Sequence, residues 1–266
     1  MKIILSVSSD IGTALAKNWV AAGHPVCGTF RTPSAATREL EELGVSLVHC
    51  DLLNSNSISS AVAALRKLGA WNTLVLAAGN QDPVGLFESV NFSDWRESVE
   101  GNFTSQLEVL HGLLPTREVN ESHEPTVLMF AGGATNRATT HYSAYTISKI
   151  ASIKFCELMD AEIQDTKFVI LGPGWVNTKI HLSTITAGTE AGSNYETTVE
   201  KLESGEMFPM EDVINCINWI DQSPKATAGG RNFSAVFDPW GAPGLDKFLI
   251  ENPDAYKLRR SQNDEG

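Results

Sequence analysis

The sequence predicts an α/β fold in which a doubly wound parallel sheet of about seven strands carries helices on both faces. Two observations lead to this fold class. Short apolar runs alternate with longer segments whose apolar residues recur at helical spacing. The short runs are almost continuously apolar, which is typical of parallel strands covered on both faces. A chain of 266 residues is long enough to bury one large core.

The first half of the chain is expected to alternate strands with helices. In the first helix, Ile11, Leu15 and Trp19 share one face, and Gly23 ends the helix. The second helix is expected to begin at Pro33, because proline is favoured in a first helical turn. Strands are expected at 3–5, 26–30, 45–48 and 73–76, and helices at 11–22, 33–43 and 57–68.

The second half continues this alternation. Ser93 is the expected N-cap of one long helix, which Pro115 stops. Strands are expected at 126–130, 168–171 and 233–237, and helices at 93–114, 143–163 and 210–220.

Composition excludes several classes of function. Lys and Arg number 20 against 32 Asp and Glu, a net charge of −12, which argues against nucleic acid and anionic membrane surfaces as partners. The start of the chain does not resemble a signal peptide, and no apolar run approaches the ~18 residues that cross a bilayer. We therefore expect a cytoplasmic protein without a metal site, because four widely spaced cysteines have no metal-ligand spacing: Cys27, Cys50, Cys156 and Cys216.

Ligands of such sheets lie at the carboxyl ends of the strands. After the first strand comes a loop of small residues, where a helix N-terminus can bind a phosphate. The alternative is a plain turn with Asp10 as the helix N-cap. The candidate phosphate-binding residues are Ser6, Ser8, Ser9, Asp10 and Ile11.

The ends of the next three strands extend this candidate site. Arg31 follows the second strand, where a guanidinium can pair with a 2′-phosphate; the alternative is a solvated surface arginine. Asp51 and Leu52 follow the third strand. The fourth strand ends in Ala77, Ala78 and Gly79, whose small side chains leave room for a flat ring.

A tyrosine and a lysine follow the fifth strand. Tyr145 and Lys149 are four residues apart, so they share one face of the helix expected at 143–163. A cation beside a phenol lowers the pKa of the phenol and suits it to proton exchange with an alcohol. The alternative is an amphipathic surface pair.

These segments together resemble the short-chain dehydrogenase/reductases, which are single-domain Rossmann enzymes of about this length. The resemblance covers roughly residues 1–240, and residues 241–266 are expected to form a C-terminal tail. Its motifs are S-x-S-S-D-I-G after the first strand, A-A-G at 77–79, Asn102, Tyr145-x-x-x-Lys149, and Pro173-Gly174-x-Val176-x-Thr178.

The resemblance implies a role for each motif. Tyr145 would be the general acid/base, with its pKa lowered by Lys149, and Asn102 would support a water-linked proton relay. Arg31 resembles the basic residue of members that prefer NADP(H), with NAD(H) as the alternative cofactor. Helices 93–114 and 143–163 would form the faces of a homodimer or homotetramer. Asp51 and Leu52 would flank adenine, and the nicotinamide would be bracketed by Pro173, Gly174, Val176 and Thr178.

Two positions depart from the family pattern. Ser6 stands where the phosphate loop usually begins with glycine. Gly132 stands where the family has its catalytic serine, 13 residues before the tyrosine. We expect Thr135 to replace that hydroxyl, with Thr139, Ser143 or the Gly133 N–H as alternatives.

The predicted function is an NADP(H)-dependent oxidoreductase that interconverts a carbonyl and a secondary alcohol on a small molecule. The alternative is a dinucleotide-binding protein with an impaired site, a redox sensor or scaffold. The tail of the sheet region, 233–240, resembles members from surface-polysaccharide pathways, which implies a sugar derivative as substrate. The family's substrate lid falls at 179–212. Within 184–212, seven residues are acidic and Lys201 is the only basic one. Carboxylates directed into the cleft would repel anionic substrates.

Overall fold

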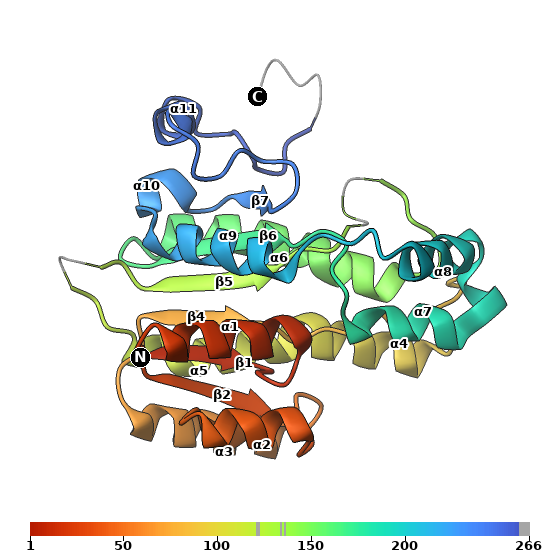
Figure 1. Ribbon diagram of the computed structural model, residues 1–266, viewed down its shortest axis with the longest axis horizontal. Coiled ribbons are helices and arrows are strands. Elements are labelled where there is room, and N and C mark those ends of the chain that lie inside the picture. Colours follow the sequence, from red (N-terminus) through yellow and green to blue (C-terminus); the bar gives the residue numbers. More distant parts are fainter. Residues whose placement is uncertain (121–122, 134, 136, 261–266) are drawn as a thin grey trace.

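A computed structural model describes residues 1–120, 123–133, 135 and 137–260 of the chain (Figure 1). Its centre is a sheet of seven parallel strands in the order β3-β2-β1-β4-β5-β6-β7, which confirms the predicted doubly wound topology. The strands are β1 Lys2–Leu5, β2 Val26–Phe30, β3 Ser46–His49, β4 Thr73–Leu76, β5 Thr126–Phe130, β6 Lys167–Gly172 and β7 Asn232–Ser234.

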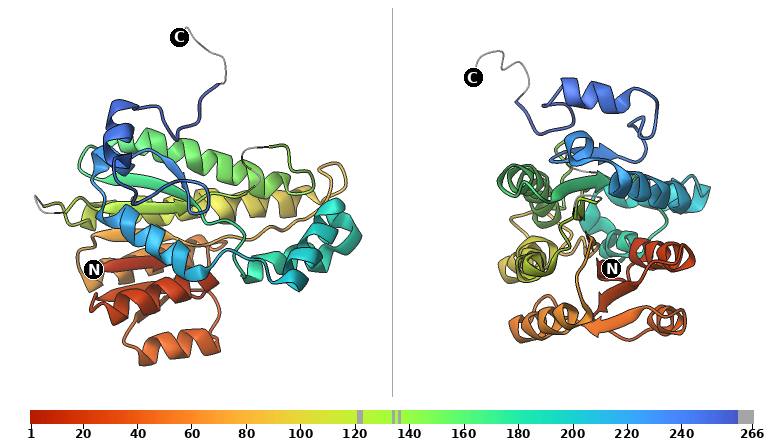
Figure 2. Two further views of the ribbon diagram at one scale, coloured as in Figure 1. Left: turned by 45° about the horizontal axis from the view of Figure 1, so that its top comes forward. Right: turned by 90° about the vertical axis from the view of Figure 1, so that its left-hand side faces the viewer.

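Helices cover both faces of this sheet (Figure 2). One face packs against α1 Asp10–Ala21, α2 Ala35–Glu42, α9 Met210–Gln222 and α11 Leu245–Glu251. The other face packs against α3 Ser55–Leu68, α5 Ser105–Leu113 and α6 Ser143–Glu162. Within the described residues, no helix is long and apolar enough to cross a membrane.

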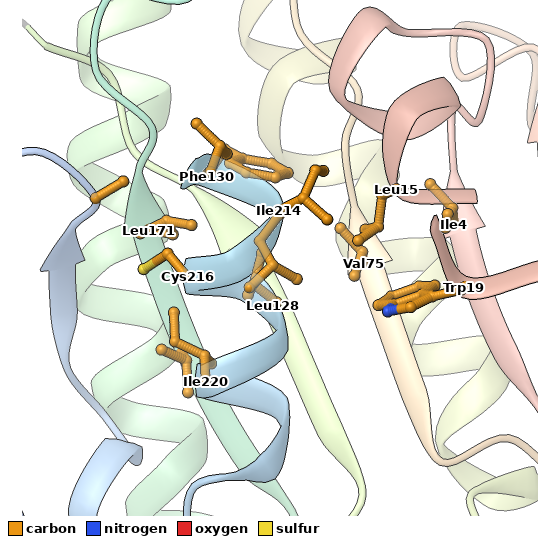
Figure 3. Packing of buried hydrophobic residues seen from close by; sticks show 14 of the residues in the cluster. Ile4, Leu15, Trp19, Val75, Leu128, Phe130, Leu171, Ile214, Cys216 and Ile220 are labelled. Carbon is orange, nitrogen blue, oxygen red and sulfur yellow. The ribbon is translucent and has the colours of Figure 1, made fainter. Parts of the chain in front are cut away.

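The strand side chains alternate between two buried clusters. On β1, Ile4 joins the first cluster, whereas Ile3 and Leu5 join the second. Figure 3 shows how the first cluster fills the space between the sheet and two helices, with Trp19 of α1 beside β1 and Ile214 of α9 beside β5. This double burial explains why the strand segments are almost continuously apolar.

Several predicted helix ends are wrong by a few residues. The N-cap of α1 is Ser9, whose hydroxyl accepts from the Gly12 N–H at 3.1 Å, so Asp10 is not the cap. Helix α2 begins two residues after Pro33, because Ser34 and Thr37 form a capping box.

The expected single helix 93–114 is three consecutive segments. Asn91 caps α4 Phe92–Val99 by accepting from the Ser93 N–H at 2.8 Å, so the predicted cap, Ser93, is wrong. A π-helical turn, Glu100–Thr104, then leads into α5. An inserted residue of this kind changes the face that the following side chains present.

The region after β6 holds short elements beyond the carboxyl ends of the strands. Between Lys179 and Ser204 these are η3 Lys179–His181, α7 Leu182–Ala187, η4 Gly188–Ala191 and α8 Ser193–Ser204. They lie together at one end of the molecule in Figure 1. We call residues 179–212 the lid segment.

The C-terminal region packs on the sheet. The last strand, β7, is shorter than predicted because the chain turns at Ser234, whose N–H donates to Asp238 at 2.6 Å. Residues expected to form a tail contribute Leu245 and Leu249 to the first buried cluster. The last six residues of that expected tail, 261–266, lie outside the described part of the chain.

Candidate functional site

Two adjoining cavities lie at the carboxyl ends of the strands. The larger measures about 1370 Å³ and the smaller about 570 Å³, and both are lined by Ser6, Arg31 and Gly79. Sites for single small ligands usually measure about 300–1,000 Å³, so the larger cavity has room for more than one small molecule. Every predicted site residue lines one of these cavities, with Asp51, Leu52 and Asn102 in the smaller one.

The loop between β1 and α1 has a backbone that glycine would favour. Ser6 adopts a left-handed conformation with φ of 64°, and its N–H donates to Thr29 Oγ1 at 2.9 Å. A Cβ at Gly12 would lie 2.7 Å from both Ser6 O and Ser9 Oγ, so the loop folds tightly over the start of α1. Ser8 and Ser9 line the larger cavity beside this helix N-terminus.

Lys179 is a site residue that the sequence analysis missed. Its backbone N–H donates to Asp10 Oδ2 at 2.6 Å, and its ammonium lies 3.4 Å from Asp10 Oδ1. The lysine lines both cavities and joins the start of the lid segment to the start of α1. Its place directly after Thr178, the last residue of a recognised motif, is the signal that could have found it.

Arg31 marks the junction of the two cavities. It lines both of them, is exposed, and forms no ion pair with any residue that the structure describes. The smaller cavity continues past Ser34, the N-cap of α2, to Asp51. Asp51 is itself held in place, because its N–H donates to Ser57 Oγ at 2.9 Å and its carboxylate accepts from the Leu53 N–H at 3.1 Å.

Asn102 joins the end of β4 to the π-helical turn. Its Oδ1 accepts from the Asn80 N–H and its Nδ2 donates to the Asn80 carbonyl, both at 3.0 Å. The Nδ2 also donates to Ser98 Oγ at 3.1 Å. An added Cβ on Gly79 would lie 3.6 Å from Asn102 Oδ1 and 3.7 Å from Lys149 Nζ. The structure thus brings three separate motifs together at one point of the cleft.

Tyr145 and Lys149 project from α6 toward the same cleft, and both are buried. The Lys149 ammonium lies 5.5 Å from the centre of the Tyr145 ring. Burial raises the pKa of Tyr145 to about 12 and lowers the pKa of Lys149 to about 8. The expected lowering of the Tyr145 pKa is therefore wrong for this structure, because desolvation of the phenolate dominates.

The Tyr145 ring occupies the space that a side chain at position 132 would need. A Cβ on Gly132 would lie 2.8 Å from Tyr145 Cε1 and 3.2 Å from its hydroxyl oxygen. The nearby Thr135 lines the cleft, but its hydroxyl donates to the Gly132 carbonyl at 3.0 Å. At Gly132 the wall of the cleft therefore consists of backbone atoms and the Tyr145 side chain, and position 132 itself supplies no hydroxyl group.

The other wall of the cleft follows β6. Gly174 has φ of +80°, which favours glycine, and it packs against Val236 of the turn after β7. The ring of Trp175 stacks on His181 with centroids 4.3 Å apart and an angle of 5°. The remaining predicted residues of this wall, Pro173, Val176 and Thr178, also line the cleft.

A hydrogen-bonded chain fixes the lid segment to the strand ends. Thr184 donates to Gln81 Oε1 at 3.1 Å, so Tyr142 donates its hydroxyl hydrogen to Thr184 Oγ1 at 2.8 Å. All three residues line the larger cavity. No sequence pattern indicates this chain of hydrogen bonds, because its members lie on three distant segments.

The described residues include no cluster of three or more metal-ligating side chains. A loop of small residues at the N-terminus of α1, a cleft at the switch point of the sheet and a buried tyrosine–lysine pair are together typical of a dinucleotide-binding oxidoreductase. The sequence model of the short chain dehydrogenase family matches residues 2–187, and the chain belongs to that family.

Relatives in this family span most of the chain. An uncharacterized oxidoreductase of Schizosaccharomyces pombe is 24% identical over 85% of this chain and 94% of its own. A serine 3-dehydrogenase of Agrobacterium fabrum is 25% identical over 84% of this chain and 88% of its own. Among solved structures, an actinorhodin polyketide ketoreductase with NADPH has a TM-score of 0.74 and 20% identity, covering 92% of this chain and 97% of the other.

Proposed function

We propose that the chain is an NADP(H)-dependent oxidoreductase that interconverts a carbonyl and a secondary alcohol on a small molecule. The observation that carries the proposal is the meeting of Tyr145, Lys149 and Asn102 at the cleft. A protein that only binds a dinucleotide has no need of a buried phenol and a buried ammonium, because burial of both groups costs stability.

The residues present fit a nicotinamide dinucleotide. The tight loop at Gly12 leaves the N-terminus of α1 open to a pyrophosphate, and Lys179 adds a cation beside it. Arg31 would bind the 2′-phosphate that distinguishes NADP(H) from NAD(H). When bound, the cofactor supplies two-electron redox chemistry at the carbonyl carbon.

The protein's own part in the reaction is proton transfer and orientation. Because its pKa is raised to about 12, Tyr145 is protonated at neutral pH and can donate its proton to the oxygen of a carbonyl being reduced. Lys149, with a pKa of about 8, is mainly charged at that pH and stabilises negative charge on the phenol oxygen. Asn102 holds the backbone of Asn80 in the loop that follows β4.

One observation favours a second candidate, a dinucleotide-binding protein with little turnover. The hydroxyl that polarises a substrate carbonyl in relatives is absent at Gly132, and loss of one such donor can cost about 2.7–4 kcal/mol of transition-state stabilisation. The test is NADPH consumption by the wild-type protein against a panel of ketones, aldehydes and sugar derivatives. Turnover of any compound supports the oxidoreductase, whereas tight NADPH binding without turnover supports the second candidate.

Arg31 provides a separate test of cofactor preference. Arg31→Ala is expected to weaken NADPH binding about tenfold to a hundredfold and to leave NADH binding unchanged, because a charged hydrogen bond to the 2′-phosphate is lost. The measurement is a fluorescence titration with each cofactor. Arg38→Ala on the exposed side of α2 is the matched control. Equal weakening of both cofactors would reject the NADP(H) preference.

The assembly and location are further parts of the proposal. We infer a homodimer or homotetramer through the faces of residues 93–114 and 143–163. On the second of these, α6, Ile147 and Leu158 are exposed apolar side chains. Sedimentation at several concentrations tests this assembly.

Four free, buried cysteines support a reducing compartment, the cytoplasm, as the location of the protein. The net charge of −12 disfavours nucleic acid and anionic membranes as partners. A sugar derivative remains the proposed substrate, to be tested in the carbonyl panel.

A further inference from the structure

Helix α8 of the lid segment separates its charges between two faces. The face toward the cleft is formed by Asn194, Thr197, Thr198 and Lys201, residues spaced by three and four positions. The glutamates of the same helix, Glu196, Glu200 and Glu203, are exposed and line neither cavity. The helix thus presents one cation to the cleft and its carboxylates to solvent.

Lys201 has no carboxylate at the positions where a helix could supply one. Three and four residues away stand Thr197, Thr198, Ser204 and Gly205, and none of them carries a charge. The lysine forms no ion pair with any residue in the described part of the chain. Its ammonium is therefore available to a ligand.

The position of Lys201 is fixed by an aromatic stack. Its ammonium lies 5.3 Å from the centre of the Trp175 ring, which also stacks on His181. His181 Nε2 lies 2.9 Å from the Val176 carbonyl oxygen, so that nitrogen carries the hydrogen and donates it. Trp175 follows directly on Pro173 and Gly174, so the stack holds the cation beside the wall of the cleft that follows β6.

The acidic residues of the lid segment do not cancel this cation. Of the seven between 184 and 212, Glu206 is the only one among the described residues that lines the cleft, and it forms no ion pair with Lys201. Repulsion of anionic substrates requires carboxylates directed into the cleft, and among these seven residues only Glu206 meets that condition.

We infer that Lys201 binds an anionic group of the substrate, so that the substrate is a small carbonyl or alcohol compound carrying a carboxylate or a phosphate. This inference rests on the proposed function, because it names the substrate class of the same cleft. A lysine binds such an oxyanion as a point charge and lowers the free energy of the bound anion relative to a neutral analogue.

The test compares matched compounds that differ only in charge. Acetoacetate is paired with methyl acetoacetate, and acetonylphosphonate with its dimethyl ester, which separates a carboxylate from a phosphate-like group. Calorimetry measures their binding to the protein saturated with oxidised NADP, which cannot reduce a ketone. The proteins are wild type, Lys201→Gln, Lys201→Arg, and Lys247→Gln, whose lysine is exposed on α11 and lines neither cavity.

Wild type and Lys247→Gln are expected to bind at least one anion tenfold or more tightly than its ester. Lys201→Gln is expected to remove that difference and to leave ester binding unchanged, and Lys201→Arg to retain most of it. Equal binding of anion and ester by wild type, or an anion preference that survives in Lys201→Gln, would overturn the inference. NADPH oxidation without an anion preference rejects this inference alone, whereas an anion preference without NADPH oxidation rejects only the proposed function.

Discussion

The space beside the Tyr145 hydroxyl is determined by Gly132. Position 132 has no side chain, so the Tyr145 ring can lie close to the backbone there. A Cβ added at Gly132 would lie 2.8 Å from Tyr145 Cε1. The sequence shows that the serine is missing, but it does not show that the tyrosine ring occupies the space of a side chain at this position. The departure at Gly132 therefore removes a hydroxyl group from this position and leaves room for the tyrosine ring.

Restoring the family's serine should not repair this site. Gly132→Ser is expected to lower the free energy of unfolding by about 1–3 kcal/mol, because the new Cβ overlaps Tyr145. Gly133→Ser is the control and should change it by less than about 0.5 kcal/mol, since no atom lies within 4 Å of the added Cβ. Urea unfolding measures both. A Gly132→Ser protein as stable as wild type would show that the tyrosine does not occupy this space.

Ser6 carries backbone strain that glycine would relieve. Ser6→Gly is expected to raise the free energy of unfolding by about 1 kcal/mol, because φ at this position is 64°. Its hydrogen bond to Thr29 is made by the backbone N–H and is retained. Ser8→Gly, in the same loop but outside the left-handed region, should bring no gain. Thermal unfolding measures both variants. A Ser6→Gly protein less stable than Ser8→Gly would contradict this explanation.

At the scale of elements, a buried ionic network joins strands and a helix at the end of the sheet opposite the cleft. Lys2 of β1 bonds to Asp221 of α9 at 2.5 Å and to Thr73 of β4 at 3.0 Å. Lys167 of β6 donates to the carbonyls of Ile220, at 2.7 Å, and Asp221, at 3.0 Å. The network therefore joins β1, β4, β6 and α9 at that end of the sheet.

Asp221→Asn should reveal the strength of this network. Removing the carboxylate leaves the Lys2 ammonium buried without a counter-ion, which is expected to cost about 3–5 kcal/mol of unfolding free energy. The control is Glu251→Gln in an exposed pair with Lys247, with an expected change below about 1 kcal/mol. Equal effects of the two substitutions would contradict the network's proposed role.

The same network predicts a pH dependence. Burial alone would raise the pKa of Asp221, but the Lys2 ammonium and the hydrogen bonds from Lys2 and Thr73 hold it below the ordinary value of 3.8. A lowered carboxyl pKa contributes stability above the unfolded-state pKa and loses it as the pH falls through the folded-state pKa. The stability difference between wild type and Asp221→Asn should therefore be full near neutral pH and shrink below 3.8. A difference that stays constant into that range would reject this origin.

Much of the element pattern could be predicted because burial on both faces leaves continuous apolar strands. The π-helical turn around Asn102 could not, because its residues, Glu100–Thr104, have no composition that distinguishes them from the residues of an α-helix. The caps Ser9 and Asn91 were missed because several polar residues compete at each helix start, and only backbone geometry selects one.

For the whole molecule, the topology explains why distant motifs meet. The chain reverses its direction of winding between β1 and β4, so the loops that follow these strands flank the cleft. Motif spacing therefore sufficed to predict residues that line it. The direction of the lid's charges depends on which face of α8 packs inward, and the positions of Lys201 and Glu206 emerge only in three dimensions.

The central claim is that Tyr145 transfers a proton during turnover although Gly132 replaces the usual serine. The most direct test measures NADPH consumption by Tyr145→Phe on a carbonyl compound that the wild type reduces, together with NADPH affinity. Tyr195→Phe is the control, because Tyr195 lies on α8 and lines neither cavity. We predict that Tyr145→Phe binds NADPH as wild type does and loses about 10²–10⁴ in rate, while Tyr195→Phe is unchanged. Undiminished turnover by Tyr145→Phe would contradict the claim.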